Sequence, residues 1–217
     1  IVSASYQIPS GFFAELFGNN PSIGTLFFIE KENNFFYGIE ANYLFGNNIK
    51  NESLMLSSIT NNDGSVIASD GYYANINFSR SGFSSNILAG YAIHLNKTNL
   101  SGVYFSLGAG YINQKILIDT KNENIPQLNE EYKKGYDDAN DGIFGKISIN
   151  YKYYSKKGGI QISTGLFNSI ARVKRLNSHL FNENNNDDSF HFGSTFGFNF
   201  GLIIPFSKIN QEEFHYY

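Results

Sequence analysis

The segment Phe190–Phe206 constrains the fold of this chain more than any other stretch. Every second residue in it is apolar except Ser194, and the residues between are mostly small or polar, beginning with His191. Successive side chains of a strand point to opposite faces, so this segment has one apolar face and one polar or tightly packed face. It is longer than an ordinary globular strand. A tilted strand that crosses a bilayer needs about 9–11 residues. The segment therefore predicts the last strand of a transmembrane β-barrel.

The composition of the 217-residue chain agrees with a barrel and excludes several other classes. Charged residues make up 16%, against about 25% in ordinary soluble domains. The mean hydropathy of −0.27 is too low for a helical membrane protein, and no apolar run approaches the roughly 20 residues that such a helix needs. Cysteine is absent, which excludes disulfides, thiol catalysis and cysteine-zinc sites. The net charge of −3 excludes a general nucleic-acid footprint.

Periodicity predicts an all-β chain with one domain, an eight-stranded antiparallel up-and-down barrel over residues 1–206, followed by a polar and aromatic tail at 207–217. The predicted strands lie near Ser10–Phe17, Ile23–Glu30, Phe35–Phe45, Gly82–Leu95, Asn99–Ile118, Ile143–Tyr154, Gly159–Val173 and Phe190–Phe206. The connections after strands two, four and six are short, and those after strands three, five and seven are long and polar. Outer-membrane barrels have short periplasmic turns and long external loops. We therefore expect the outer membrane as the location, with both termini periplasmic.

Several polar residues share the inward parity of the predicted strands. The interior of an eight-stranded barrel is just wide enough to be filled by side chains, so we expect an internal polar network instead of an open pore. An unpaired charge there would be costly, so Glu15 or Glu40 should pair with Lys146 or another cation. The residues predicted to form this lumen network are Glu15, Glu40, Lys146, Lys152 and Asn199.

Four cations lie at the predicted external ends of strands: Arg80, Arg172, Lys174 and Arg175. They are candidates for contacts with lipopolysaccharide phosphates or anionic lipid head groups. The alternative is that they are cations whose long side chains extend to the membrane rim without binding a specific ligand.

The sequence offers no convincing metal site. The acidic run Asp137–Gly142 resembles a calcium loop, but position three of that loop would be Ala139 and position twelve Ser148, where oxygen ligands and a Glu are needed. The four His residues are scattered without the spacing of a zinc site. We therefore expect no metal and no cofactor.

The catalytic signal is equally weak. Outer-membrane enzymes that act on lipid A use a His with a Ser near the lipid boundary. Ser69-Asp70 with a distant His94 or His179 could imitate such a pair, but the spacing carries no specificity. His191 and Ser194 fall on opposite faces of one strand and cannot form a pair.

Five short segments carry a family resemblance: Tyr43–Asn47, Asp70–Ala74, Arg80–Phe83, Pro126–Leu128 and Glu131–Asp137. Together they resemble small outer-membrane β-barrel proteins of Bacteroidota-type bacteria, and the likeness spans most of the chain. That family has no assigned activity, so the resemblance implies no catalytic residues. In architecture it is similar to the eight-stranded OmpA/OmpX class without the peptidoglycan-binding domain. Small barrels in this phylum also occur as accessory subunits of large outer-membrane assembly or secretion machines.

These observations favour a non-enzymatic outer-membrane barrel with a structural or interaction role, as an accessory subunit of a larger complex. Its expected partners are outer-membrane lipid, lipopolysaccharide and other outer-membrane proteins, and not nucleic acid. The loops after strands three and five would contact the partner, and strands one and two, whose alternation is poorest, would pack against another barrel. The alternatives are a lipid-modifying enzyme and a narrow channel. A soluble lipocalin-like barrel is disfavoured because its aromatic side chains would have to point into the cavity.

Overall fold

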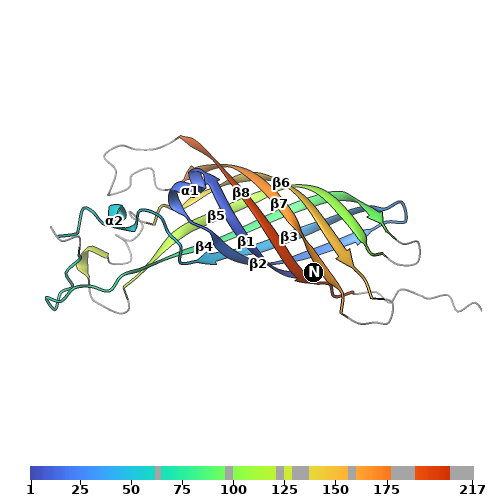
Figure 1. Ribbon diagram of the computed structural model, residues 1–217. Coiled ribbons are helices and arrows are strands. Elements are labelled where there is room, and N and C mark those ends of the chain that lie inside the picture. Colours follow the sequence, from blue (N-terminus) through green and yellow to red (C-terminus); the bar gives the residue numbers. More distant parts are fainter. Residues whose placement is uncertain are drawn as a thin grey trace, which may run out of the picture.

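The computed structural model describes residues 1–61, 65–95, 100–120, 125–128, 137–155, 160–176 and 189–205. Its strands form one closed antiparallel barrel in which neighbours in sequence are neighbours in space and the last strand pairs with the first (Figure 1). The strands are β1 (Val2–Gly11), β2 (Asn20–Glu30), β3 (Phe35–Gly46), β4 (Asn77–His94), β5 (Gly102–Asp119), β6 (Asn140–Tyr153), β7 (Ile162–Arg175) and β8 (Phe190–Leu202). The predicted fold class, an all-β up-and-down barrel of eight strands, is confirmed.

The two ends of the barrel differ. Helices α1 (Phe12–Leu16) and α2 (Glu52–Met55) and the 3-10 turn η1 (Pro126–Leu128) belong to connections at one end, which we call the loop end (Figure 1). At the opposite end, the turn end, β1 begins and β8 finishes, with Val2 paired to Leu202. Among the described residues, neither helix has the length and hydropathy of a membrane-crossing segment.

The predicted first strand, Ser10–Phe17, is wrong. The strand lies earlier, at Val2–Gly11, and α1 follows it directly. Gly11 adopts a φ of 60° at the junction, a backbone conformation that glycine tolerates best. In α1, Phe12, Phe13 and Leu16 are buried, which is the spacing of one helical face. Glu15 is therefore exposed on the helix and does not join the lumen network.

The other predicted strands are present with shifted bounds. β4 begins at Asn77, five residues before the predicted start at Gly82, and β6 begins at Asn140 instead of Ile143. The predicted polar connections were therefore too long. Phe206 and the tail at 207–217 lie outside the described residues.

Large apolar side chains point outward from every strand. Examples are Tyr6, Phe27, Ile39, Ile87, Leu107, Ile147, Leu166 and Phe198, one from each strand in order. Soluble monomers rarely expose a contiguous apolar surface larger than a few hundred Å². This barrel carries such a surface around its whole circumference.

Buried apolar side chains gather at both ends of the barrel. The loop-end cluster comprises Phe12, Phe13, Leu16, Phe17, Leu44, Ile49, Met55, Leu56, Val66, Ala68, Phe78, Ile112, Ile116, Ile118, Ile125, Leu128, Phe144, Ala171 and Val173. The turn-end cluster comprises Phe36, Leu88, Ala92, Tyr104, Tyr154 and Ile203. Between the two clusters lies a layer of polar side chains, which is the candidate functional site.

Candidate functional site

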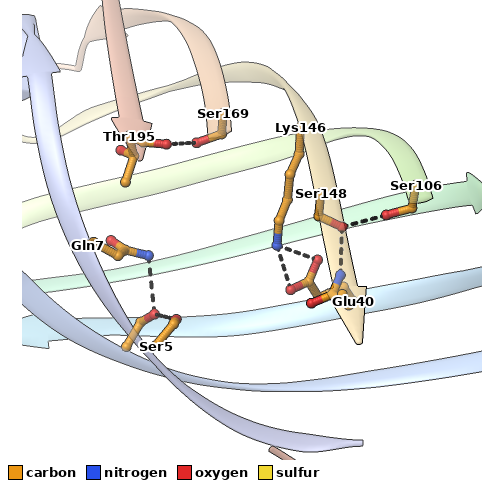
Figure 2. Close-up of polar contacts among 10 residues, drawn as sticks. Ser5, Gln7, Glu40, Ser106, Lys146, Ser148, Ser169 and Thr195 are labelled. Atoms are coloured by element: carbon orange, nitrogen blue, oxygen red, sulfur yellow. Dashed lines mark hydrogen bonds and ion pairs between the residues drawn. The ribbon is translucent and has the colours of Figure 1, made fainter. Parts of the chain in front are cut away.

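An ion pair stands in the middle of the polar layer. Glu40 comes from β3 and Lys146 from β6, and the Lys146 Nζ donates to both Glu40 carboxylate oxygens at 2.7 Å (Figure 2). The two side chains are 13% and 14% exposed. Lys146 also lies over the Phe167 ring, 4.6 Å from its centroid. The inward parity of two strands far apart in sequence thus brings together two of the predicted lumen residues.

Hydroxyl and amide groups extend this layer on both sides. Ser106 and Ser148 share a hydrogen bond of 2.7 Å between β5 and β6 (Figure 2). Near β1 and β2, the Ser22 hydroxyl bonds Ser5 at 2.6 Å and accepts from Gln7 at 3.1 Å. These bonds satisfy polar groups that would be costly to leave unpaired in an interior.

Two small cavities flank the ion pair. Each has a volume of about 40 Å³, and both are lined by Ser3, Glu40, Lys146 and Asn199. Asn199, a predicted lumen residue, therefore lies between them. Each cavity has room for a few waters or one small ion, and neither could hold an organic substrate, since such sites measure about 300–1,000 Å³.

Arg80 was predicted at the external rim, and that prediction is wrong. The side chain is 3% exposed and lies inside the barrel. Its guanidinium donates to Gln114 Oε1 at 3.1 and 2.6 Å and to Gln7 Oε1 at 3.1 Å, and it stacks 4.7 Å from the centroid of the Phe17 ring. The predicted strand began at Gly82 and therefore left Arg80 outside it. In the longer β4, Arg80 has the same parity as Ser84 and points inward. That parity is the signal in the sequence that could have placed it correctly.

Lys152 lies in the lumen as predicted, but its surroundings are aromatic. The side chain is 2% exposed, and its Nζ lies 3.4, 3.9 and 4.9 Å from the ring centroids of Phe28, Tyr104 and Phe36. Its charge is thus stabilised by ring faces. The alternation along single strands could not predict this aromatic cage. The cage depends on how three other strands bring Phe28, Phe36 and Tyr104 next to Lys152 of β6.

A carboxylate missed by the sequence analysis lies beside this cage. Glu30 is bound by His94 Nε2 at 2.7 Å and accepts from the Tyr104 hydroxyl at 2.9 Å. Burial, with the charge of Glu30, raises the pKa of the Tyr154 phenol just beyond β6. His94 is therefore a structural residue at the turn end, remote from Ser69 in the connection between β3 and β4, and that predicted pair does not form. His179 lies outside the described residues.

The remaining rim cations divide between the two faces of β7. Arg172 points outward and lies 3.9 Å from the centroid of the Phe190 ring, and Lys174 has the same parity. Arg175 points inward, where its Nε donates to Asp138 Oδ1 at 3.0 Å. The predicted lipid-contact role of Arg175 is wrong for the reason that applies to Arg80, since its parity turns it away from the rim.

The described residues offer little reactive chemistry. They contain no group of three or more His, Cys, Asp or Glu side chains that could hold a metal ion. One Ser–His contact occurs at the loop end of β8, where Ser189 Oγ lies 3.3 Å from His191 Nε2. The His191 ring stacks on Phe12 with centroids 4.3 Å apart, so packing fixes its orientation.

Comparisons with known proteins give no family. No protein-family model matches the chain. No curated protein matches it either. Among solved structures, the chain is similar to Neisserial surface protein A (NspA), with 11% sequence identity, 92% of each chain covered and a TM-score of 0.39.

Proposed function

We propose that this chain is an outer-membrane β-barrel that crosses the bilayer with all eight strands. The observation that carries the proposal is the apolar surface around the whole circumference, with Ile87 and Leu107 each 68% exposed. In water such a surface would drive aggregation. A closed barrel also leaves no unpaired strand edge, which a bilayer does not tolerate.

The alternation along β4 and β5 supports a loop end that lies in water. In the middle of these strands the apolar residues point outward, as Ile87 and Leu107 do. Towards the loop end the phase reverses, because Phe78 and Ile116 point inward and are buried while Lys115 is exposed. A polar exterior over an apolar interior is the pattern of a protein in water. We propose that this end is external and that the turn end, with both termini of the barrel, is periplasmic.

The role that we propose is interaction, without catalysis or transport. Apolar clusters fill both ends of the barrel around the ion-paired middle. This filling argues against a conducting channel, and the small cavities argue against an interior active site. What the molecule offers to a partner is its folded loop end.

We propose that the loop end docks the barrel, as an accessory subunit, onto a larger outer-membrane protein. The connection between β3 and β4 is anchored by buried Met55 and Val66, while Tyr72 and Tyr73 at its tip are 75% and 68% exposed. Aromatic side chains on a rigid support are typical anchors of protein interfaces. Because β1 lies at Val2–Gly11, the outward-facing residues of β1 and β2 alternate regularly. Poor alternation is therefore no longer a reason to expect that these two strands pack against another barrel.

Gentle-detergent extraction of native membranes, followed by sizing and mass spectrometry, tests this proposal. We expect the wild-type barrel to migrate in fixed ratio with a larger membrane protein, and the double variant Tyr72→Ser/Tyr73→Ser to migrate alone. The matched control is Lys50→Ala, an exposed residue of the same connection, which should leave the complex intact. Migration of the wild type at monomer size would refute the accessory role but not the membrane location.

One contact favours a second candidate, a lipid-modifying enzyme. Ser189 Oγ lies 3.3 Å from His191 Nε2 near the proposed external rim, and Ser189 is exposed; a hydroxyl with an adjacent base is the arrangement of an activated nucleophile. Mass spectrometry of lipid A from cells that express the wild type or Ser189→Ala tests it. Identical lipid A in the two strains and in a deletion strain would remove this candidate.

The outward cations of β7 give a proposed contact with lipid. Arg172, held against Phe190, and Lys174 stand just above the apolar surface of β7, where lipopolysaccharide phosphates would lie. The resemblance to small barrels of Bacteroidota-type bacteria stays a prediction.

A further inference from the structure

Among the described residues, cationic side chains inside the barrel outnumber the carboxylates. The inward carboxylates in this part of the chain are Glu30, Glu40 and Asp138, and each is already engaged. Glu40 binds Lys146, Asp138 binds Arg175, and Glu30 binds His94 and Tyr104.

Arg80 has no share in any of these pairs. Its three hydrogen bonds end on the neutral amide oxygens of Gln114 and Gln7, and its flat face lies on Phe17. A guanidinium carries five N–H donors, so two of its N–H groups remain beyond these bonds. A buried charge with only neutral partners is costly, which makes Arg80 a site where a counter-ion would stabilise the fold.

Room for a counter-ion lies directly beside Arg80. The cavity on the loop-end side of the ion pair, about 40 Å³ in volume, is lined by Arg80 and also by Lys146. Hydroxyl groups from four strands add to its polar wall, namely those of Ser3, Ser5, Ser84, Ser169 and Thr195. Glu40, neutralised by Lys146, is the single carboxylate among the residues that line it.

We propose that this cavity binds a small monovalent inorganic anion, of the size of a halide, next to the Arg80 guanidinium. The lining supplies two cations and several hydroxyl donors against one carboxylate, so the potential in the cavity is positive. A cavity with the volume of a few waters can hold a halide but is too small for organic carboxylates and lipid phosphates. The inference does not depend on the proposed accessory role, because the site lies inside the barrel.

Bromide is a suitable probe because it can be located in crystals by anomalous scattering. The barrel is purified in detergent, and its melting temperature is followed by circular dichroism in sodium bromide and in sodium gluconate of equal ionic strength, since gluconate is too large for the cavity. We expect a saturable rise of several degrees in bromide relative to gluconate. In Arg80→Met the rise should vanish, and in Arg80→Lys, which keeps the charge, part of it should remain. Lys115→Met, which removes an exposed outward cation, should respond like the wild type.

Crystals of the wild-type barrel soaked in bromide give a second readout that does not depend on the folding of any variant. An anomalous peak within hydrogen-bond distance of the Arg80 guanidinium would support the site. Water alone in the cavity, or a bromide effect that persists unchanged in Arg80→Met, would overturn it.

Discussion

The ion pair between Glu40 and Lys146 allows a quantitative test of the interior. Replacing Glu40 with Gln keeps the shape of the side chain but leaves the Lys146 ammonium without its carboxylate. Removing one partner of a buried pair costs about 3–5 kcal/mol. The two side chains are 13% and 14% exposed to the small cavities, and water there can screen part of the charge, so we expect a loss of about 2–4 kcal/mol.

The double variant Glu40→Gln/Lys146→Met decides what this loss means. If the loss comes from the unpaired Lys146 ammonium, removing that charge as well should restore most of the stability. Replacing both partners of a buried ion pair with uncharged residues often changes stability little. We expect a coupling energy of about 2 kcal/mol between the two positions. Lys146 also contacts the Phe167 ring, and the Met side chain can keep that contact.

Unfolding by urea in detergent or lipid vesicles measures these changes. The chain has no Trp, so circular dichroism of the strands is the appropriate signal. Glu15→Gln is the matched control, because Glu15 is exposed on α1, and it should change stability by less than about 0.5 kcal/mol. The single variant Lys146→Met completes the comparison. If Glu40→Gln cost no more than the control, or if the losses of Glu40→Gln and Lys146→Met simply added in the double variant, the ion pair would not stabilise the lumen and our reasoning would be wrong.

Three further predictions concern the outer surface, the loop-end cluster and the lumen. Ile87→Arg should destabilise the barrel in vesicles by about 2–4 kcal/mol because it puts a charge in lipid, whereas Tyr72→Arg at the exposed loop tip should change unfolding little. Phe13→Ala should cost about 3–5 kcal/mol in the same assay, and Gly193→Ala should also destabilise, because its new Cβ would lie 2.6 Å from the Phe13 ring. In planar bilayers the purified barrel should give no steady conductance, and stable channel openings would contradict a filled lumen.

The sequence predicts a strand of this fold well where the same parity stays apolar along the whole segment. The central parts of β3 to β8 follow from period two alone, and with them the inward placement of Glu40 and Lys146. The first strand could not be found this way, because Phe12, Phe13 and Phe17 look like the apolar residues of a strand when their helical spacing is overlooked. Glu15 was misplaced as a consequence. The pairing of side chains across the lumen depends on the tilt and register of all the strands, which no local pattern contains.

The misplacement of Arg80 has a more general cause. β4 passes through two surroundings, so its alternation has two phases: Ile87 points outward and Phe78 inward, while the parity of the backbone never changes. A prediction that assumes a single apolar face ends the strand where the phase reverses, near Gly82, and assigns the next cation to a rim. In a barrel that leaves a bilayer, such a reversal marks the boundary between lipid and water. If the loop end is external, as we propose, Arg80 lies in sequence on the water side of that boundary, while its side chain points into the barrel and is 3% exposed. This position explains how its charge is buried without a carboxylate partner.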